Sequence, residues 1–139
     1  MALLEVKNLK KVYTTRFTQN QVQALTNVNF SVNKGEYVAI MGESGSGKTT
    51  LLNILAALDK PTSGQVLLHG KDITHISEKE IASFRREHLG FVFQDFNLLD
   101  NFNNRDNIFL PLVLSKKKYP EMKKRLEPIA KQLGIENIL

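Results

Sequence analysis

Apolar and polar residues alternate in two stretches early in the chain, residues 3–6 and 24–32. Such alternation is typical of half-buried strands, because successive side chains of a strand point to opposite faces. The stretch between them, residues 13–23, is polar and irregular and predicts a loop. A further strand is expected at residues 65–69, and the turn at residues 70–72 should close a hairpin after it.

Two short and mostly apolar runs, residues 36–41 and 90–93, predict buried strands. Apolar spacing and end signals predict helices at residues 48–58, 77–86, 107–114 and 120–133. Pro111 and Pro128 fall inside two of these helices and should bend them, because proline removes a main-chain hydrogen bond. The side chains expected on the buried faces of the first and last helices are Leu51, Leu52, Leu55 and Leu58, and Met122, Leu126, Ile129, Ala130 and Leu133.

Length and composition fit one soluble globular domain, with 139 residues of which 42% are hydrophobic and 24% charged. The chain has no cysteine, which excludes disulfides and cysteine-based metal sites. No apolar run approaches the ~20 residues of a membrane span, and residues 1–10 lack the core of a signal peptide. The net charge of +5 gathers at residues 116–118 and 123–125. It predicts a solvated helix face rather than nucleic-acid binding, since no aromatic platform accompanies it.

The strongest chemical signal is the sequence GESGSGKTT at residues 42–50, which fits the phosphate-binding pattern G-x-x-x-x-G-K-[ST]. It follows a predicted strand and opens a predicted helix, which is the context that this pattern requires. An ordinary glycine- and serine-rich turn before a helix is the alternative interpretation. Strand, loop and helix together favour the phosphate-binding one.

The residue types of this loop explain the expected chemistry. Gly42, Gly45 and Gly47 permit turns that aim successive N–H groups at a phosphate chain, and the helix start adds its positive end. Lys48 is expected to reach the terminal phosphates. The Thr49 hydroxyl is expected to bind Mg²⁺, and Thr50 either donates to a phosphate oxygen or only supports the first helical turn.

Two other features leave alternatives open at the level of residues alone. Tyr13 could stack on a nucleotide base, although an ordinary core or surface tyrosine is favoured by composition. Residues 95–106 are rich in Asn and Asp yet contain several large apolar side chains. These either pack on their own domain or form a surface for a partner.

Beyond the loop, the chain resembles the N-terminal part of an ATP-binding cassette (ABC) transporter ATPase over essentially its whole length. The resemblance depends on Tyr13, on GESGSGKTT, on TSGQVLLHGKDI at residues 62–73 and on GFVFQDFNLL at residues 90–99. The sequence NIFLPL at residues 107–112 is similar to the subgroup that serves macrolide, lipoprotein and antimicrobial-peptide permeases. Residues 84–100, FRREHLGFVFQDFNLLD, followed by NIFLPLVLSKKKY at residues 107–119, resemble the bacitracin and lantibiotic resistance branch most.

The resemblance implies a role for each matching position. Tyr13 matches the aromatic residue that stacks on adenine, which reverses the preference stated above. Gln94 matches the glutamine that contacts Mg²⁺ and the attacking water and senses the γ-phosphate, so Lys48 and Gln94 are the expected catalytic residues and Thr49 and Gln94 the expected metal ligands. The Walker A positions that would hold ATP are Gly42, Glu43, Ser44, Gly45, Ser46, Gly47, Lys48, Thr49 and Thr50.

The implied fold is α/β: a P-loop NTPase core with an antiparallel β subdomain, incomplete at the C-terminus. Residues 1–139 would form a partial nucleotide-binding domain, because the LSGGQ signature, the Walker B strand, the D-loop and the switch histidine have no match. Asp59 follows an apolar run but is interpreted as a helix end rather than as the Walker B acid. In the family's sheet, strands from the missing part lie between the strand before the phosphate-binding loop and the strand that ends at Gln94. Without them both strands would have exposed edges, so a strand-swapped or otherwise rearranged oligomer is a further expectation.

The function implied by the resemblance is ATP hydrolysis that powers transport, in the cytoplasm at the inner face of the cell membrane. A second copy of the ATPase and a membrane permease, docked on residues 95–106, are the implied partners, and nucleic acid is not. Residues 1–139 alone should not turn over ATP. A kinase would not explain the later motifs, and a GTPase would need N-K-x-D where residues 33–36 give NKGE. A non-transport cassette protein, acting in translation or DNA repair, remains the alternative.

Overall fold

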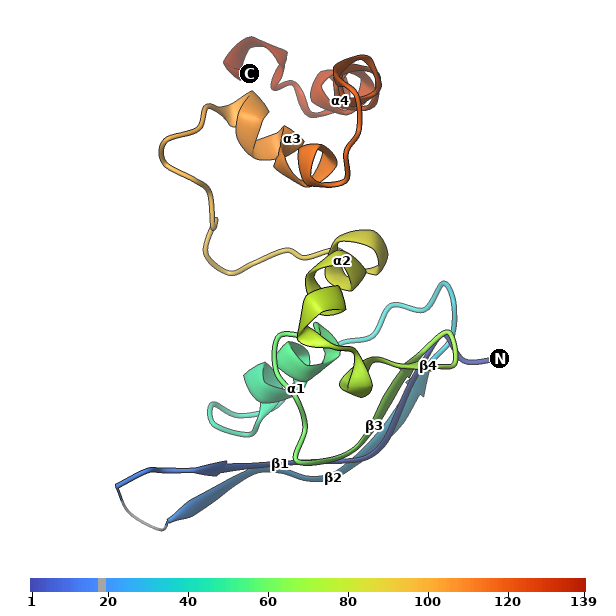
Figure 1. Cartoon of the computed structure of the whole chain (residues 1–139), viewed down its shortest axis with the longest axis vertical. Helices are drawn as coiled ribbons and strands as arrows, with labels where there is room; N and C mark the ends of the chain where they lie inside the picture. Colours follow the sequence, from blue (N-terminus) through green and yellow to red (C-terminus); the bar gives the residue numbers. More distant parts are fainter. Residues whose placement is uncertain (18–19) are drawn as a thin grey trace. The chain divides into compact units, whose positions relative to one another are not determined.

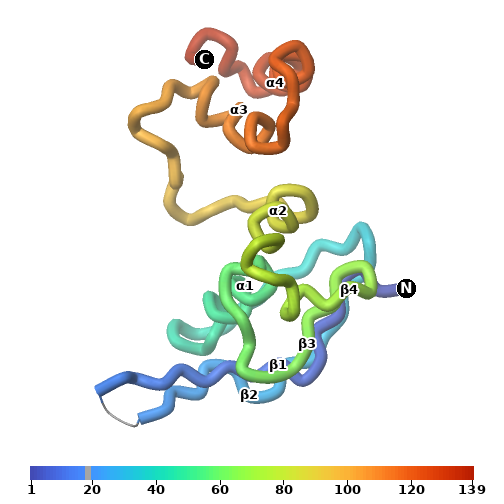
Figure 2. Tube along the Cα trace, viewed as in Figure 1, coloured from blue at the N-terminus to red at the C-terminus, as the bar shows by residue number. Residues whose placement is uncertain are grey.

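The computed structural model describes residues 1–17 and 20–139. The chain forms two compact units, Met1–Leu89 and Gly90–Leu139. Figure 1 shows the strands and helices α1 and α2 in the first unit, and helices α3 and α4 in the second. Figure 2 traces the same path as a tube.

The first unit is built on a four-stranded antiparallel sheet with the order β2-β1-β3-β4. The strands are β1 (Leu4–Thr14), β2 (Gln21–Val32), β3 (Ser63–Leu68) and β4 (Lys71–Asp72). The central strand β1 pairs Val6 with Phe30 on one side and with Val66 on the other. The expected strands at residues 3–6, 24–32 and 65–69 and the expected hairpin of β3 with β4 are therefore confirmed.

The loop predicted at residues 13–23 is too long, because β1 and β2 continue into it as a hairpin; of the described residues in this range, only 15–17 and 20 lie outside the strands. Tyr13 pairs with Val22 and Thr14 with Gln21. The residues of β2 in this part are exposed, and the pairing has register shifts further along. Main-chain hydrogen bonds hold such a ribbon together without a buried face, so its polar composition concealed it. Thr18 and Gln19, at the centre of the predicted loop, lie outside the described residues.

The core of the first unit lies between the sheet and the helices α1 (Lys48–Leu55) and α2 (Glu78–His88), and Figure 1 shows both helices on the same side of the sheet. The burial predicted for α1 is only partly right. Leu51 and Ile54 are buried, whereas Leu52 and Leu58 are 52% exposed. Because the helix ends at Leu55, Leu58 lies outside it and is not on its buried face. The buried residues are Val6, Leu9, Leu25, Leu51, Ile54, Val66, Ile73, Ile76 and Phe84.

The two buried strands predicted at residues 36–41 and 90–93 do not form. Neither segment pairs with another strand within the described ranges. Tyr37 is fully exposed and Val92 is as exposed as in an extended chain. An apolar run becomes a strand only where a neighbouring strand accepts its main-chain hydrogen bonds, and the sheet of this unit ends at β2 and β4.

A short 3₁₀ turn, η1 (Ile73–His75), links β4 to α2. Helix α2 begins after Ser77, as predicted, with Glu78 and Glu80 in its first turn. The Ser77 hydroxyl contacts the Glu80 carboxylate at 3.4 Å rather than capping a main-chain N–H. The predicted start is therefore confirmed, but the side-chain bonds of a capping box are not formed.

The second unit is a pair of helices, α3 (Asn104–Leu114) and α4 (Tyr119–Leu133), followed by the 3₁₀ turn η2 (Glu136–Ile138). Its core consists of Phe109, Met122, Leu126 and Ala130. The wider stripe predicted for α4 is wrong at Ile129 and Leu133, which are 54% and 65% exposed. The buried residues of α4 recur every four positions, because a single neighbouring helix covers only a narrow face.

The predicted prolines lie within α3 and α4, at Pro111 and Pro128, and both helices continue through them. Gly134 ends α4 in the left-handed conformation typical of a helix C-terminus. Across residues 1–17 and 20–139, every helix is too short or too polar to span a lipid bilayer.

Candidate functional site

The phosphate-binding pattern forms the connection between β2 and α1. The Ser46 N–H donates to the Glu43 carbonyl at 3.1 Å and closes a turn. Gly47 follows in a left-handed conformation, with φ of 98°, and its carbonyl accepts the Leu51 N–H at 2.9 Å. Helix α1 therefore starts within the motif, and its first N–H groups face the end of the loop, where an anion is favoured.

Gly47 brings the loop into close contact with β2. A Cβ atom at this position would lie 2.6 Å from the Ala24 carbonyl oxygen and 3.0 Å from Leu25 Cδ2. Gly45 also has a positive φ, of 82°, but a Cβ there would meet open space. The first position thus requires glycine for two reasons, conformation and space, and the second for conformation alone.

Lys48, the first residue of α1, turns its side chain back along the loop. Its Nζ donates to the Glu43 carbonyl at 2.8 Å and to the Gly42 carbonyl. The ammonium group is thereby held at the mouth of the loop instead of extending into solvent. A positive charge beside unpaired helical N–H groups makes this end of α1 suitable for a phosphate chain.

A cavity of about 510 Å³ lies against the loop. Residues of both the sheet and the loop line this cavity: Tyr13 comes from β1, and Lys48 and Thr49 come from the phosphate-binding pattern. Its size is within the range of small-molecule sites. The full lining is Tyr13, Val22, Gln23, Ala24, Ser44, Gly45, Gly47, Lys48, Thr49 and Thr50.

The structure thus brings Tyr13 together with the phosphate-binding residues, although 31 or more positions separate them in the chain. Of the nine predicted loop positions, Gly42, Glu43 and Ser46 shape the turn rather than line the cavity. The cavity residues of β2 were missed by sequence reasoning. Recognising that β1 and β2 form a hairpin would have found them, because Val22 is the strand partner of Tyr13.

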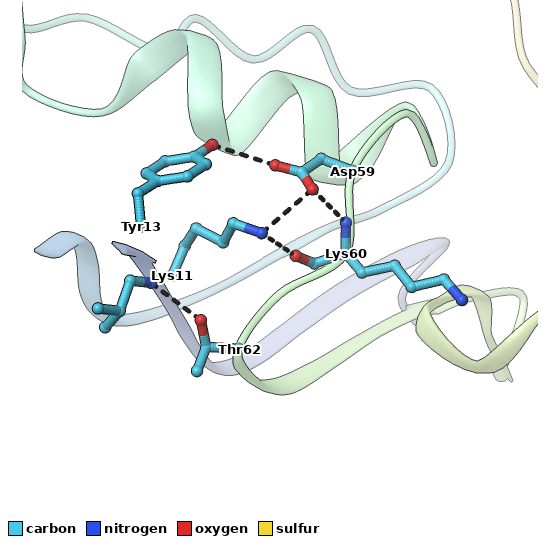
Figure 3. A network of polar contacts seen from close by, with 6 residues as sticks. Lys11, Tyr13, Asp59, Lys60 and Thr62 are labelled. Carbon is cyan, nitrogen blue, oxygen red and sulfur yellow. Dashed lines mark hydrogen bonds and ion pairs between the residues drawn. The ribbon is translucent and has the colours of Figure 1, made fainter. Parts of the chain in front are cut away.

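Tyr13 has a set of polar partners that the sequence did not indicate (Figure 3). Its hydroxyl donates to Asp59 Oδ2 at 3.1 Å, and the Lys11 ammonium lies 5.0 Å from the centre of its ring. Lys11 Nζ in turn donates to Asp59 Oδ1 at 3.1 Å and to the Lys60 carbonyl at 2.7 Å. Asp59, interpreted above as only a helix end, is the centre of this group.

The charge of Asp59 is stabilised by these contacts. Partial burial raises the pKa of its carboxyl group, but the hydrogen bonds from Lys11, the Lys60 N–H and Tyr13 outweigh it. The pKa of Asp59 is therefore lower than its ordinary value of 3.8. The carboxylate is ionised at neutral pH and holds the Lys11 ammonium beside the tyrosine ring.

Gln94, the remaining predicted site residue, lies in an exposed stretch of the second unit. Its predicted contacts with a metal ion and with the attacking water stay predictions. Within the part of the chain that the structure describes, no three His, Asp or Glu side chains gather as a ready-made metal site.

Comparison with protein families gives a match over residues 25–139 to the ABC transporter family. Over all 139 residues, the chain is 51% identical to the ABC transporter ATP-binding protein YvcR of Bacillus subtilis, and it covers 54% of that protein. It is 44% identical over 138 residues to the bacitracin export ATP-binding protein BceA of Halalkalibacterium halodurans, with 54% of that protein covered. The chain thus spans about half the length of these curated relatives.

Solved structures give the same result for the fold. The ATP-binding cassette MJ0796, in a dimeric post-hydrolysis state bound to ADP and Pi, superposes with a TM-score of 0.84 at 37% identity. The match covers 96% of this chain and 58% of the other. A second dimeric structure of the same cassette gives the same values. The expected α/β fold of an ABC ATPase, with its antiparallel subdomain, is confirmed for the part that the chain covers.

Proposed function

Because the chain belongs to the ABC transporter family, we propose that it is the ATP-binding part of an ATPase that powers transport. The observation that supports this most directly is the cavity shared by Tyr13 and the phosphate-binding loop. An aromatic ring at one side and a lysine at a helix start at the other match the two ends of a nucleotide, its base and its phosphates.

In this proposal each part of the cavity has its own role. Tyr13 stacks on the adenine ring. The N–H groups of the loop and the first turn of α1 bind the phosphates. Lys48 provides a positive charge to the terminal phosphates and stabilises the charge that develops during transfer. The nine Walker A residues proposed to hold ATP are Gly42, Glu43, Ser44, Gly45, Ser46, Gly47, Lys48, Thr49 and Thr50.

The residues also fit a Mg²⁺ ion that arrives with the nucleotide. Mg²⁺ takes few protein ligands and completes its shell with phosphate oxygens and water. The exposed Thr49 hydroxyl lines the cavity and offers one such oxygen. When bound, the ion would neutralise phosphate charge, and Gln94 is proposed as a further ligand that senses the terminal phosphate.

We propose two partners for this ATPase. One is a second copy of the same protein, in keeping with the dimeric MJ0796 structures. The other is a membrane permease that docks on residues 95–106. This segment leaves Phe96 90% exposed and Leu98 59% exposed, which is costly in water unless another protein covers them. Such a complex would hold the protein on the cytoplasmic face of the cell membrane.

The proposed cargo class is an antimicrobial peptide or antibiotic, supported by the similarity to a bacitracin export ATP-binding protein. The relatives favour a transporter over a non-transport cassette protein. We further propose that residues 1–139 form one partial nucleotide-binding domain. Without the signature and Walker B motifs, this piece should bind nucleotide and show no significant Mg-ATPase turnover of its own.

Replacing Lys48 by alanine tests the proposal. Each charge-assisted hydrogen bond to phosphate contributes about 1.5–3 kcal/mol, so ATP affinity should fall at least about tenfold. The affinity is measured by isothermal titration calorimetry with Mg-ATP. Lys34→Ala is the matched control, because this exposed lysine lies in the turn before the loop and lines no part of the cavity. Equal ATP affinity in the Lys48 and Lys34 variants would exclude the proposed site.

A further inference from the structure

Asp59 joins two residues of β1 from a distant part of the sequence (Figure 3). One carboxylate oxygen accepts from Lys11 Nζ, 48 positions away, and the other accepts from the Tyr13 hydroxyl, 46 positions away. Lys11 and Tyr13 are two apart on one strand and so lie on the same face. Asp59 thus connects both side chains to the turn that follows α1.

The tyrosine ring is consequently held at two places. Its hydroxyl is fixed by Asp59, and Lys11 lies over the ring with its ammonium 5.0 Å from the ring centre. The Lys11 side chain is only 15% exposed, so this cation–π contact is partly shielded from water. Lys11 occupies one face of the ring, and a planar base can stack only on the other.

Asp59 and Lys11 are not part of the cavity lining, whereas Tyr13 is. Any influence that they have on a bound nucleotide therefore passes through the tyrosine. A free tyrosine side chain on an exposed strand would sample several rotamers, and binding would have to fix one of them. The contacts with Asp59 and Lys11 fix it in advance.

A purely structural role, attaching the turn after α1 to β1, is already filled by other contacts. The Val12 N–H donates to Thr62 Oγ1 at 2.9 Å, and the Thr62 N–H donates to the Lys10 carbonyl at 2.8 Å. These bonds hold the same turn to the same strand. The contacts of Asp59 are therefore not required to attach this turn to β1.

We propose that Asp59, together with Lys11, is a positioning residue for the nucleotide base. It holds the Tyr13 ring at the wall of the cavity with one face free, so that the adenine stacks on a surface that is already in place. This inference rests on the proposed function, because it assumes that the cavity takes a nucleotide. In this inference Asp59 affects the binding of the base, through Tyr13, and does not affect the binding of the phosphates.

The test compares two probes, Mg-ATP and inorganic tripolyphosphate, on the natural gene product that contains these residues. Asp59→Ala removes both tethers, and Tyr13→Phe keeps the ring but removes the hydroxyl that Asp59 holds. Each variant should bind Mg-ATP about three- to tenfold more weakly and tripolyphosphate unchanged. The double variant should be no weaker than Asp59→Ala, because both changes remove the same hydrogen bond.

Asp72→Ala is the matched control for loss of a carboxylate. Asp72 accepts from the Thr74 N–H at 2.9 Å and lines no part of the cavity, so neither probe should be affected. Equal weakening of both probes by Asp59→Ala would show a structural role and overturn the inference, as would unchanged Mg-ATP binding in Tyr13→Phe. If Lys48→Ala also left Mg-ATP binding unchanged, the proposed function itself would fail.

Discussion

Gly47 determines how closely α1 can begin beside β2, and replacing it by alanine should destabilise the first unit. The added Cβ would lie 2.6 Å from the Ala24 carbonyl oxygen, which is main-chain and cannot rotate away. The loop or the strand would have to move by several tenths of an ångström. Because Leu25 Cδ2 would lie only 3.0 Å from the added Cβ, and Leu25 belongs to the same core as Leu51 of α1, the movement would disturb the packing of α1 on the sheet.

The cost has two parts. Placing a residue with a Cβ in the left-handed conformation costs about 1–2 kcal/mol, and φ of 98° is outside its comfortable range. Inserting an atom into a closely packed place adds about 1–3 kcal/mol. We therefore expect Gly47→Ala to lower the free energy of unfolding by about 2–5 kcal/mol. Gly45→Ala should cost only the first part, because its Cβ would meet open space.

Urea unfolding without nucleotide, followed by circular dichroism, measures both variants against the parent chain. The comparison needs unchanged m-values, so that the midpoints report stability. The expected result is a clear order, with Gly47→Ala less stable than Gly45→Ala by about 1–3 kcal/mol. Equal losses in the two variants would show that the contact with Ala24 is relieved at no cost, and would refute the packing argument.

Three other predictions concern the same chain. The pKa of Asp59 is lower folded than unfolded, so the unfolded chain binds more protons as pH falls below about 3.8. The free energy of unfolding should therefore fall as the pH is lowered below about 3.8. Urea midpoints measured across this pH range should change less in Asp59→Ala than in the parent chain. Pro128 is exposed inside α4, and Pro128→Ala should raise the melting temperature, since an interior proline costs a helix about 3 kcal/mol. Leu126→Ala should cost about 2–5 kcal/mol and Ile129→Ala much less in urea unfolding, because Leu126 is 8% exposed and Ile129 is 54% exposed.

The parts of the fold that the sequence predicts well are those specified by local chemistry. The G-x-x-x-x-G-K-[ST] pattern depends on residues at fixed spacing, and α1 begins inside it, at Lys48, as predicted. The start of α2 and the end of α4 follow from single residues, Ser77 and Gly134. Such signals act over four or five positions, so no knowledge of distant contacts is needed.

The parts that could not be predicted depend on distant partners. Residues 36–41 have the composition of a buried strand, but the described sheet offers them no neighbour. Residues 13–23 look like a loop, yet pairing between β1 and β2 extends into them. The role of Asp59 was hidden for the same reason, because its partners Lys11 and Tyr13 are more than forty positions away.

The order of the strands has a consequence for how this chain is made. During synthesis β1 and β2 emerge early and can form their hairpin, but β1 is central and its other neighbour, β3, ends about 36 residues after β2. At ribosomal rates of about 5–20 residues per second, that interval lasts roughly 2–7 s. For those seconds one side of β1 offers unsatisfied amides to any nascent strand nearby. We therefore expect a chaperone that shields newly made chains to raise the yield of this protein most when it acts before residue 68 has left the ribosome.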